Sequence, residues 1–356
     1  MGLRDPDIGR LLAAFRIEKA DRVPHWELSI EGRTLSYLMG REVPYLDYKG
    51  LLPSEREEYR LRTGQFYPEA SSWFLAPPDL LGLCQTWPNE AMAPYCSYYG
   101  TAGAAERGSI RSWEDLEKLR PVIPVEDRMR YLQSYIDIAR GTSVGVGATF
   151  FAPFTDTCEN LGVDGLAYLL YDDPKLVTHL LDLYTRDARH VAEAVADLDI
   201  DFVYLADDIA DNKGPFLQPR LMEELWLPRA AYILEPIHAR HIPVAFHCCG
   251  NLTQIMPWLI QLGVSAVQPV QPNCNDIYAL KKQYGDRMCF IGNIEVPGCL
   301  SFGTVDDVVR ETKEHIDRLA YNGGYVCASS HSVTPAVKPE NYVAMLETII
   351  DYRAYR

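Results

Sequence analysis

The sequence lacks any run of eighteen apolar residues and carries comparatively few positive charges. It contains 34 lysines and arginines against 49 aspartates and glutamates, which gives a formal net charge of −15. A membrane-spanning helix needs about 18 or more consecutive apolar residues, whereas nucleic acids and anionic membranes attract basic surfaces. We therefore expect that neither a membrane nor a nucleic acid is the main partner.

Signals for secretion and for disulfide bonding are also missing. The first residues, Met1-Gly2-Leu3-Arg4-Asp5-Pro6, contain no apolar stretch and no serine or threonine at position 6 for myristoylation. The nine cysteines are odd in number and scattered along the chain, which does not suggest a disulfide framework. These absences predict a cytoplasmic protein with mostly buried cysteines and a few that act as ligands or nucleophiles.

Several common catalytic and nucleotide-binding motifs are absent as well. Gly145-Val146-Gly147 lacks the third glycine of a dinucleotide-binding fingerprint, and the sequence has no Gly-Lys-Ser/Thr phosphate loop. No serine stands in a nucleophile elbow. The chemistry must therefore depend on other side chains.

Strand-like and helix-like segments alternate through most of the chain. Short β-branched runs separated by amphipathic helices predict βαβ units and a parallel sheet. We expect a single domain over residues 1–356 that folds as an α/β (β/α)8 TIM barrel, with a doubly wound sheet as the alternative fold. The predicted strands are 23–30, 143–149, 201–206, 243–247, 265–269, 288–292 and 324–328. The predicted helices are 158–171, 174–196, one that begins at Pro219, 252–262, 275–284, 304–321 and 339–352.

Residues 50–125 interrupt this alternation and are rich in proline and aromatic residues. We predict an aromatic-rich insertion that covers the barrel with a small core of its own. The alternative is that some of its aromatic rings wall the mouth of the active-site pocket. The aromatic residues concerned are Trp73, Phe74, Trp87, Tyr95, Tyr98 and Tyr99.

The strongest local signal is a strand that ends in histidine and cysteine, Pro243-Val244-Ala245-Phe246-His247-Cys248-Cys249-Gly250-Asn251. Side chains alternate along a strand, so His247 and Cys249 share one face while Cys248 points to the other. An imidazole and a thiolate on one face are a suitable pair of zinc ligands. A packed histidine beside two structural cysteines is the alternative.

Other predicted strand ends supply residues that could complete a metal site. Asp207 and Asp208 directly follow a buried strand, where acids without a partner are costly. Glu223 lies fifteen positions beyond Asp208, in the first turn of a predicted helix, where it would also complement the helix dipole. His331 follows the last strand, and Asn293 follows the strand that ends at Gly292.

An ordered series of segments resembles the uroporphyrinogen decarboxylase superfamily, which includes the corrinoid-dependent methyltransferases. The resemblance extends over nearly the whole chain and implies a (β/α)8 barrel. It rests on Ala20-Asp21-Arg22-Val23-Pro24-His25-Trp26, Ala206-Asp207-Asp208 with Gly214-Pro215, Phe246-His247-Cys248-Cys249-Gly250-Asn251, Gly285-Asp286-Arg287, Ile291-Gly292-Asn293-Ile294-Glu295 and Pro339-Glu340-Asn341.

The segment after the first strand disfavours decarboxylation. Family decarboxylases hold the carboxylates of a porphyrinogen through arginines in a sequence like Trp-x-Met-Arg-Gln-Ala-Gly-Arg. In this chain Arg33 matches the second arginine, whereas Ser29 replaces the first, and Glu27 and Glu31 add negative charge. Acids at these positions would repel a polycarboxylate.

The methyltransferase branch holds zinc through a His-x-Cys pair and a later cysteine, and the resemblance carries this role to His247 and Cys249. His331 stands where the later cysteine is expected. The resemblance thus implies a zinc-dependent methyltransferase, like an O-demethylase, that uses His247 and Cys249 with His331, Asp208 or Glu223. Its candidate catalytic residues are Asp207, Glu27 and Asn293.

The implied reaction moves a methyl group between a small substrate, such as a methoxylated aromatic, and a corrinoid. The chain lacks the Asp-x-His-x-x-Gly sequence that seats cobalamin. The cobalamin would therefore be carried by a separate corrinoid protein. The alternatives are a divergent decarboxylase that works without metal and a non-catalytic barrel that binds a ligand.

Overall fold

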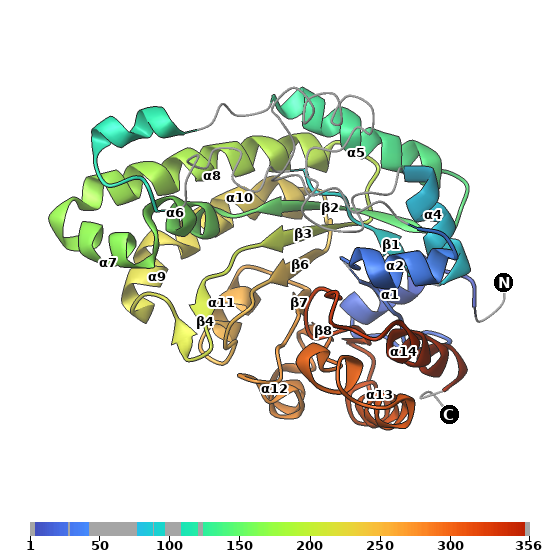
Figure 1. Cartoon of the computed structure of the whole chain (residues 1–356). Helices are drawn as coiled ribbons and strands as arrows, with labels where there is room; N and C mark the ends of the chain where they lie inside the picture. The colour runs from blue at the N-terminus through green and yellow to red at the C-terminus, as the bar shows by residue number, and fades with distance from the viewer. Residues whose placement is uncertain are drawn as a thin grey trace.

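The computed structural model describes residues 4–27, 29–42, 77–87, 89–96, 108–119 and 124–352. Its centre is a curled sheet of seven parallel strands in the order β1-β2-β3-β6-β7-β8-β9, surrounded by helices (Figure 1). The strands are β1 (Ala91–Met92), β2 (Gly145–Phe151), β3 (Phe202–Ala206), β6 (Val244–His247), β7 (Ala266–Gln268), β8 (Cys289–Ile291) and β9 (Tyr325–Val326). A separate antiparallel hairpin joins β4 (Ala210–Asp211) and β5 (Gly214–Pro215).

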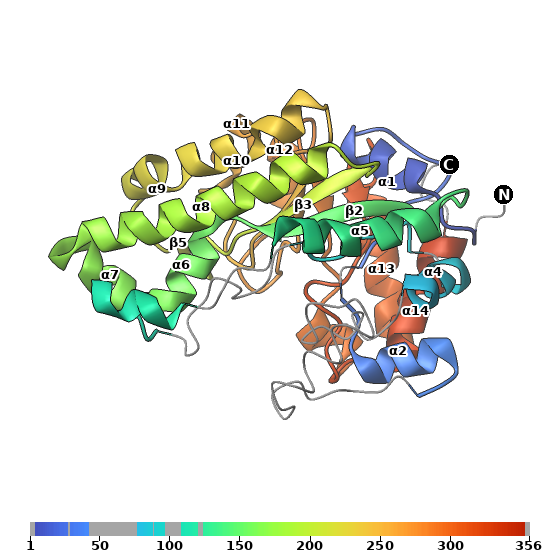
Figure 2. The ribbon, with the colours of Figure 1, turned by 90° about the horizontal axis from the view of Figure 1, so that it is seen from above.

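The helices lie mostly on the outer face of the sheet (Figures 1 and 2), except that Leu11, Ala14 and Phe15 of the first helix pack on its concave side. They are α1 (Ile8–Phe15), α2 (Gly32–Met39), α4 (Pro77–Thr86), α5 (Val125–Ala139), α6 (Pro153–Leu161), α7 (Val163–Asp172), α8 (Pro174–Ala196), α9 (Pro219–Leu225), α10 (Leu227–Ala239), α11 (Met256–Gln261), α12 (Ile277–Tyr284), α13 (Val305–Leu319) and α14 (Pro339–Asp351). A 3-10 helix, η3 (Trp113–Lys118), and a π-helical turn, η4 (Val296–Leu300), complete the described elements. In the described part of the chain, no helix is both long and apolar enough to cross a membrane.

Residues 24–25 connect the two ends of the curled sheet. The amide of Cys327 donates to the Pro24 carbonyl at 3.0 Å, and the amide of Glu90 donates to the His25 carbonyl at 3.1 Å. Of the strand predicted at 23–30, the described residues form only isolated bridges at His25 and Ile30. This arrangement agrees with a fold of the TIM-barrel type. Each strand of the sheet lies beside the next one in the chain, which excludes the doubly wound alternative, because the strand order of a doubly wound sheet reverses at a switch point.

Two apolar layers follow from the alternation of side chains along each strand. One layer lies between the sheet and the helices and includes Phe246 and Phe290. The other fills the concave side, where Trp26 contacts Phe202 and Tyr204 edge to face at centroid distances of 5.3 and 5.0 Å. Gly147 makes room for this layer, because a Cβ there would lie 2.5 Å from the Phe202 ring.

The prediction of an insertion over residues 50–125 is wrong for the described residues 77–96. Helix α4 packs against α5, and β1 pairs with β2 as a strand of the main sheet. Strand β1 could not be recognised in the sequence, because its two residues, Ala91 and Met92, are too few to show the alternation of a strand. Trp73, Phe74, Tyr98 and Tyr99 lie outside the described residues.

Candidate metal centre

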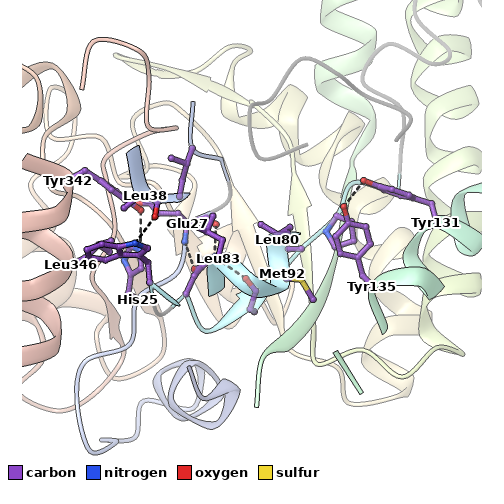
Figure 3. A pocket seen from close by; sticks show the side chains of 16 residues that line it. His25, Glu27, Leu38, Leu80, Leu83, Met92, Tyr131, Tyr135, Tyr342 and Leu346 are labelled. Atoms are coloured by element: carbon purple, nitrogen blue, oxygen red, sulfur yellow. Dashed lines mark hydrogen bonds between the residues drawn. The ribbon is translucent and has the colours of Figure 1, made fainter. Parts of the chain in front are cut away.

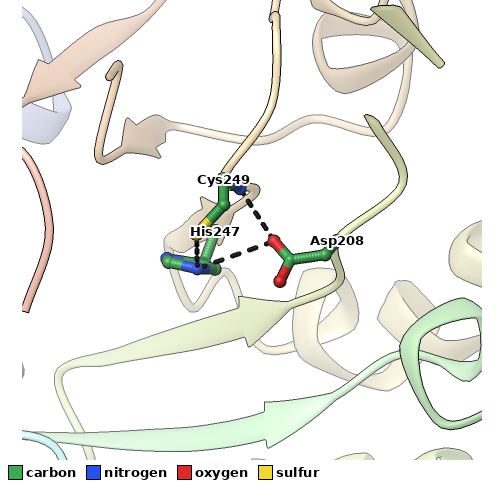
Figure 4. A group of neighbouring side chains, drawn as sticks. All are labelled: Asp208, His247 and Cys249. Atoms are coloured by element: carbon green, nitrogen blue, oxygen red, sulfur yellow. Dashed lines mark hydrogen bonds and ion pairs between the residues drawn. The ribbon is translucent and has the colours of Figure 1, made fainter. Parts of the chain in front are cut away.

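Three potential metal ligands meet at the carboxyl ends of β3 and β6. One ligand atom from each of Asp208, His247 and Cys249 lies within 4.8 Å of the others. The Cys249 Sγ atom is 3.2 Å from His247 Nε2, which is 3.7 Å from Asp208 Oδ1 (Figure 4). Parallel pairing places Ala206 opposite His247, so the residues that follow the two strands emerge side by side. Enzymes with this type of fold carry their chemistry at this end of the sheet.

The orientation of the His247 ring is set by two neighbours on the concave side. Its Nδ1 atom lies 2.6 Å from Gln268 Oε1 and 2.7 Å from Tyr204 Oη, and the Tyr204 hydroxyl also donates to Gln268 Oε1. An amide oxygen only accepts, so Nδ1 carries the proton and donates it to Gln268. The lone pair of Nε2 therefore faces Cys249 and Asp208, as a ligand nitrogen requires.

Replacement of Gln268 by leucine should weaken zinc binding by roughly 10- to 100-fold, because the ring of His247 loses the acceptor that fixes its tautomer. Competition with a chromophoric chelator measures the dissociation constant directly. Gln261→Leu is the matched control, since Gln261 is exposed at the end of α11. Equal zinc affinities for the two variants would contradict this role for Gln268.

Asp208 is held in place through its own backbone and through Cys249. The Asp208 amide donates to Thr155 Oγ1 at 2.7 Å, and the Cys249 amide donates to Asp208 Oδ1 at 2.7 Å. The Asp208 side chain remains 41% exposed, whereas that of His247 is 19% exposed. The cluster therefore has a buried side and an open side from which a substrate can approach.

The thiol of Cys249, one of the three clustered ligands, also contacts His331. Burial raises the pKa of Cys249, and a hydrogen bond with the His331 side chain acts in the opposite direction. The structure thus brings His331 next to Cys249, although it lies outside the group of three. The set combines nitrogen, sulfur and oxygen donors of the kind that zinc takes in tetrahedral sites, so these residues fit the ion.

Alternation along the strand behaves as the sequence predicts. Cys248 is fully buried in the layer between sheet and helices, whereas Cys249 is partly exposed beside His247. Cys327 is buried in the same outer layer and belongs to the core.

Asp207 points away from the cluster. Its carboxylate accepts hydrogen bonds from the amides of Phe154 and Thr155 at 3.2 and 2.7 Å, from Thr155 Oγ1 at 2.8 Å and from Trp226 Nε1 at 2.9 Å. Burial raises its pKa to about 6 despite these donors. Asp207 thus anchors the start of α6 and, through Thr155, the backbone of Asp208.

Glu223 is likewise not brought to the cluster. It is exposed on α9 and accepts a hydrogen bond from Trp258 Nε1 at 3.1 Å. The hairpin of β4 and β5 lies between Asp208 and this helix, so the sequence separation gave no information on distance.

Glu27 and Asn293 are buried in other surroundings. Glu27 lines a cavity of about 40 Å³ with His25, Leu83 and Tyr342 (Figure 3), and the lining of this cavity does not include Asp208, His247 or Cys249. Asn293 donates to the Val270 carbonyl at 2.6 Å and accepts from His315 Nε2 at 2.8 Å. Neither residue joins the group at Asp208, His247 and Cys249.

One of the aromatic residues predicted for the pocket mouth lies near the cluster. Tyr95 stacks on Phe151 with 5.7 Å between ring centroids, and burial together with the negative charges of Cys249 and Asp208 raises its pKa. Trp87 is partly buried and packs against the core, and its indole nitrogen donates to the Leu38 carbonyl at 3.0 Å.

Comparison with known proteins assigns the family. The model of the uroporphyrinogen decarboxylase (URO-D) family matches residues 82–352, well over half of the chain. The chain belongs to this family. Its similarity to uroporphyrinogen decarboxylase from Alkalilimnicola ehrlichii is 23% identity over 96% of this chain and 93% of that protein.

Relatives in the family also include methyltransferases. Methylcobamide:CoM methyltransferase from Methanosarcina barkeri is 27% identical over 50% of this chain and 50% of its own length. A solved structure of a methyltransferase from Methanosarcina mazei superposes with a TM-score of 0.67 at 20% identity and covers 99% of each chain. At this level of identity the likeness shows a shared fold.

Three residues that orient the cluster were not among those predicted from the sequence, namely Tyr204, Gln268 and Thr155. Tyr204 stands inside a buried strand and resembles any core aromatic residue. A signal was nevertheless present, because Tyr204, Ala206 and Asp208 alternate onto the face that also holds His247.

Proposed function

We propose that this member of the URO-D family transfers a methyl group between a small methylated substrate and a corrinoid carried by a separate protein. The observation that carries the proposal is the convergence of Asp208, His247 and Cys249 at the carboxyl ends of two strands, with His247 Nε2 directed at the other ligands. The similarity to a methylcobamide:CoM methyltransferase supports the reaction class.

In this proposal His247, Cys249 and Asp208 hold a zinc ion, with His331 as the remaining candidate ligand. Bound zinc would supply a Lewis acid for the substrate's oxygen or sulfur atom. The barrel is taken to be a closed (β/α)8 barrel in which residues 24–27 occupy the place of a strand, so that both ends of the sheet border one pocket. The protein is assigned to the cytoplasm.

The residues of the chain itself orient the substrate and supply a proton. The stacked pair of Tyr95 and Phe151 offers an apolar wall on which a methoxylated aromatic ring can lie. Loss of the methyl group leaves a substrate oxygen that needs a proton. His331 lies beside the cluster and is placed to supply this proton, whereas the candidate catalytic residues Asp207 and Glu27 point elsewhere.

Decarboxylation is the second candidate, because relatives named as uroporphyrinogen decarboxylases align over almost the whole chain. The residues aligned with porphyrinogen-binding arginines weigh against it. Ser29 is buried in place of the first arginine, and Arg33 is exposed on α2.

Removal of zinc tests the proposal. We expect dialysis against a strong chelator to abolish methyl transfer from methylated substrates to cob(I)alamin, and one equivalent of zinc to restore it. Transfer is followed by the change in cobalamin absorbance, and metal content by elemental analysis. A preparation without stoichiometric metal that decarboxylates uroporphyrinogen would refute the proposal and establish the alternative.

A further inference from the structure

Glu27 is a buried carboxyl group that has no cationic partner among the described residues. Its side chain is 6% exposed and lies between the start of β1 and helices α4 and α14 (Figure 3). Oxygen Oε1 accepts from the Ser329 amide at 2.6 Å, and Oε2 lies 2.9 Å from Ser329 Oγ. An ionised carboxylate in such a place is costly unless it is paired with a cation.

A count of protons at Ser329 indicates which form Glu27 takes. Ser329 Oγ lies within hydrogen-bond distance of both Glu27 Oε2 and the carbonyl oxygen of His331. A serine hydroxyl has one proton to donate, and a carbonyl oxygen can only accept. The Ser329 proton therefore goes to His331, and the contact with Glu27 is satisfied when the carboxyl group itself donates to Ser329 Oγ.

We propose that Glu27 acts as a neutral carboxylic acid that positions residues 329–331 and thereby holds His331 beside Cys249. In this chain of contacts Glu27 donates to Ser329 Oγ, and Ser329 Oγ donates to the backbone of His331. The hydrogen bond between His331 and Cys249 then extends the chain to the cluster. Glu27 is thus a positioning residue that acts on the cluster through Ser329 and His331.

None of the ionisable groups that face Glu27 among the described residues carries a positive charge that would stabilise an ionised Glu27. His25 lies on its own segment, Cys327 precedes Ser329, Tyr342 comes from α14 and Tyr204 comes from β3. Burial lowers the pKa of His25 to about 4, raises that of Cys327 to about 12 and raises those of both tyrosines well above their usual range. All four are neutral at pH 7, and burial raises the pKa of Glu27 itself to about 8.

The effect on the cluster rests on the proposed function, whereas the protonation of Glu27 does not. The test therefore needs two measurements, zinc affinity and the pH dependence of thermal stability. Glutamine is the matched replacement, because its NH2 group donates to Ser329 Oγ and its oxygen accepts from the Ser329 amide. Glu117→Gln, on the exposed face of η3, is the control.

We expect Glu27→Gln to bind zinc as the wild type does, whereas Glu27→Ala and Ser329→Ala bind it about 10-fold more weakly. A Glu27→Gln variant as weak as Glu27→Ala would overturn the proposal, because it would show that the negative charge is needed. Ser329→Ala removes only a hydroxyl group and tests the relay even if Glu27→Ala fails to fold.

The melting temperature tests the protonation of Glu27 without any metal. A carboxyl group with a raised pKa stabilises the folded state fully below its unfolded pKa near 4.5, and this stabilisation is lost as the pH rises through about 8. Glu27→Gln should match the wild type at pH 5 and melt higher at pH 8 and 9. If zinc does not bind at all, the proposed function fails. The pH dependence of the two melting temperatures then still tests whether Glu27 is protonated. A difference in melting temperature that does not change with pH would overturn it.

Discussion

His247→Ala should lose stoichiometric zinc and retain less than about one hundredth of the wild-type rate of methyl transfer. Residues that merely orient a zinc ligand already account for about 10- to 100-fold in affinity or activity, so the loss of a ligand costs more. His247 contributes the nitrogen that lies 3.2 Å from Cys249 Sγ and 3.7 Å from Asp208, and its removal opens the centre of the cluster. Elemental analysis and the cobalamin assay measure the two effects.

Two controls separate this effect from general destabilisation. His190→Ala removes an exposed histidine of α8 and should leave zinc content and rate unchanged. Cys249→Ser should repeat the loss of zinc, whereas Cys299→Ser, at a partly exposed cysteine of η4, should not. Full methyl-transfer activity in metal-free His247→Ala would contradict the assignment of a metal centre.

The parallel sheet could be predicted because strands and helices of ordinary length alternate in the sequence. Strands β2, β3, β6, β7 and β8 lie within or close to the predicted ranges. Strand β1 could not be found, since it has two residues and is preceded by a segment rich in turn-forming residues. In the segment 23–30, where a strand was expected, the described residues pair only through isolated bridges at His25 and Ile30.

Some residues of the candidate site could be predicted from the local sequence, and others depend on tertiary contacts. The alternation of side chains was enough to group His247 with Cys249 and to send Cys248 to the core. The choice between Asp207 and Asp208 required knowledge of which face of β3 is concave, and that is fixed by the packing of Phe202 and Tyr204 against Trp26. Glu223 required the path of the β4–β5 hairpin, which depends on tertiary contacts.

Substitution of Asp207 by alanine should destabilise the fold by about 4 kcal/mol or more rather than act on the chemistry directly. Four donors, from Phe154, Thr155 and Trp226, would lose their buried acceptor, and each such group costs about 1–3 kcal/mol when left unpaired. Asp207→Asn should also destabilise, because one side of an asparagine amide presents hydrogen-bond donors to these donors. Urea denaturation curves measure the change in free energy of unfolding.

The matched control and the activity of the folded variant identify the role of Asp207. Asp199→Ala, at an exposed aspartate before β3, should leave the free energy of unfolding within about 0.5 kcal/mol of the wild type. At a temperature where Asp207→Ala remains folded, we expect residual zinc binding. The Asp207 carboxylate of the wild type acts on Asp208 only through Thr155. If Asp207→Ala had wild-type stability and no methyl transfer, Asp207 would be a catalytic base, and the inward face of β3 would have been assigned to the wrong residues.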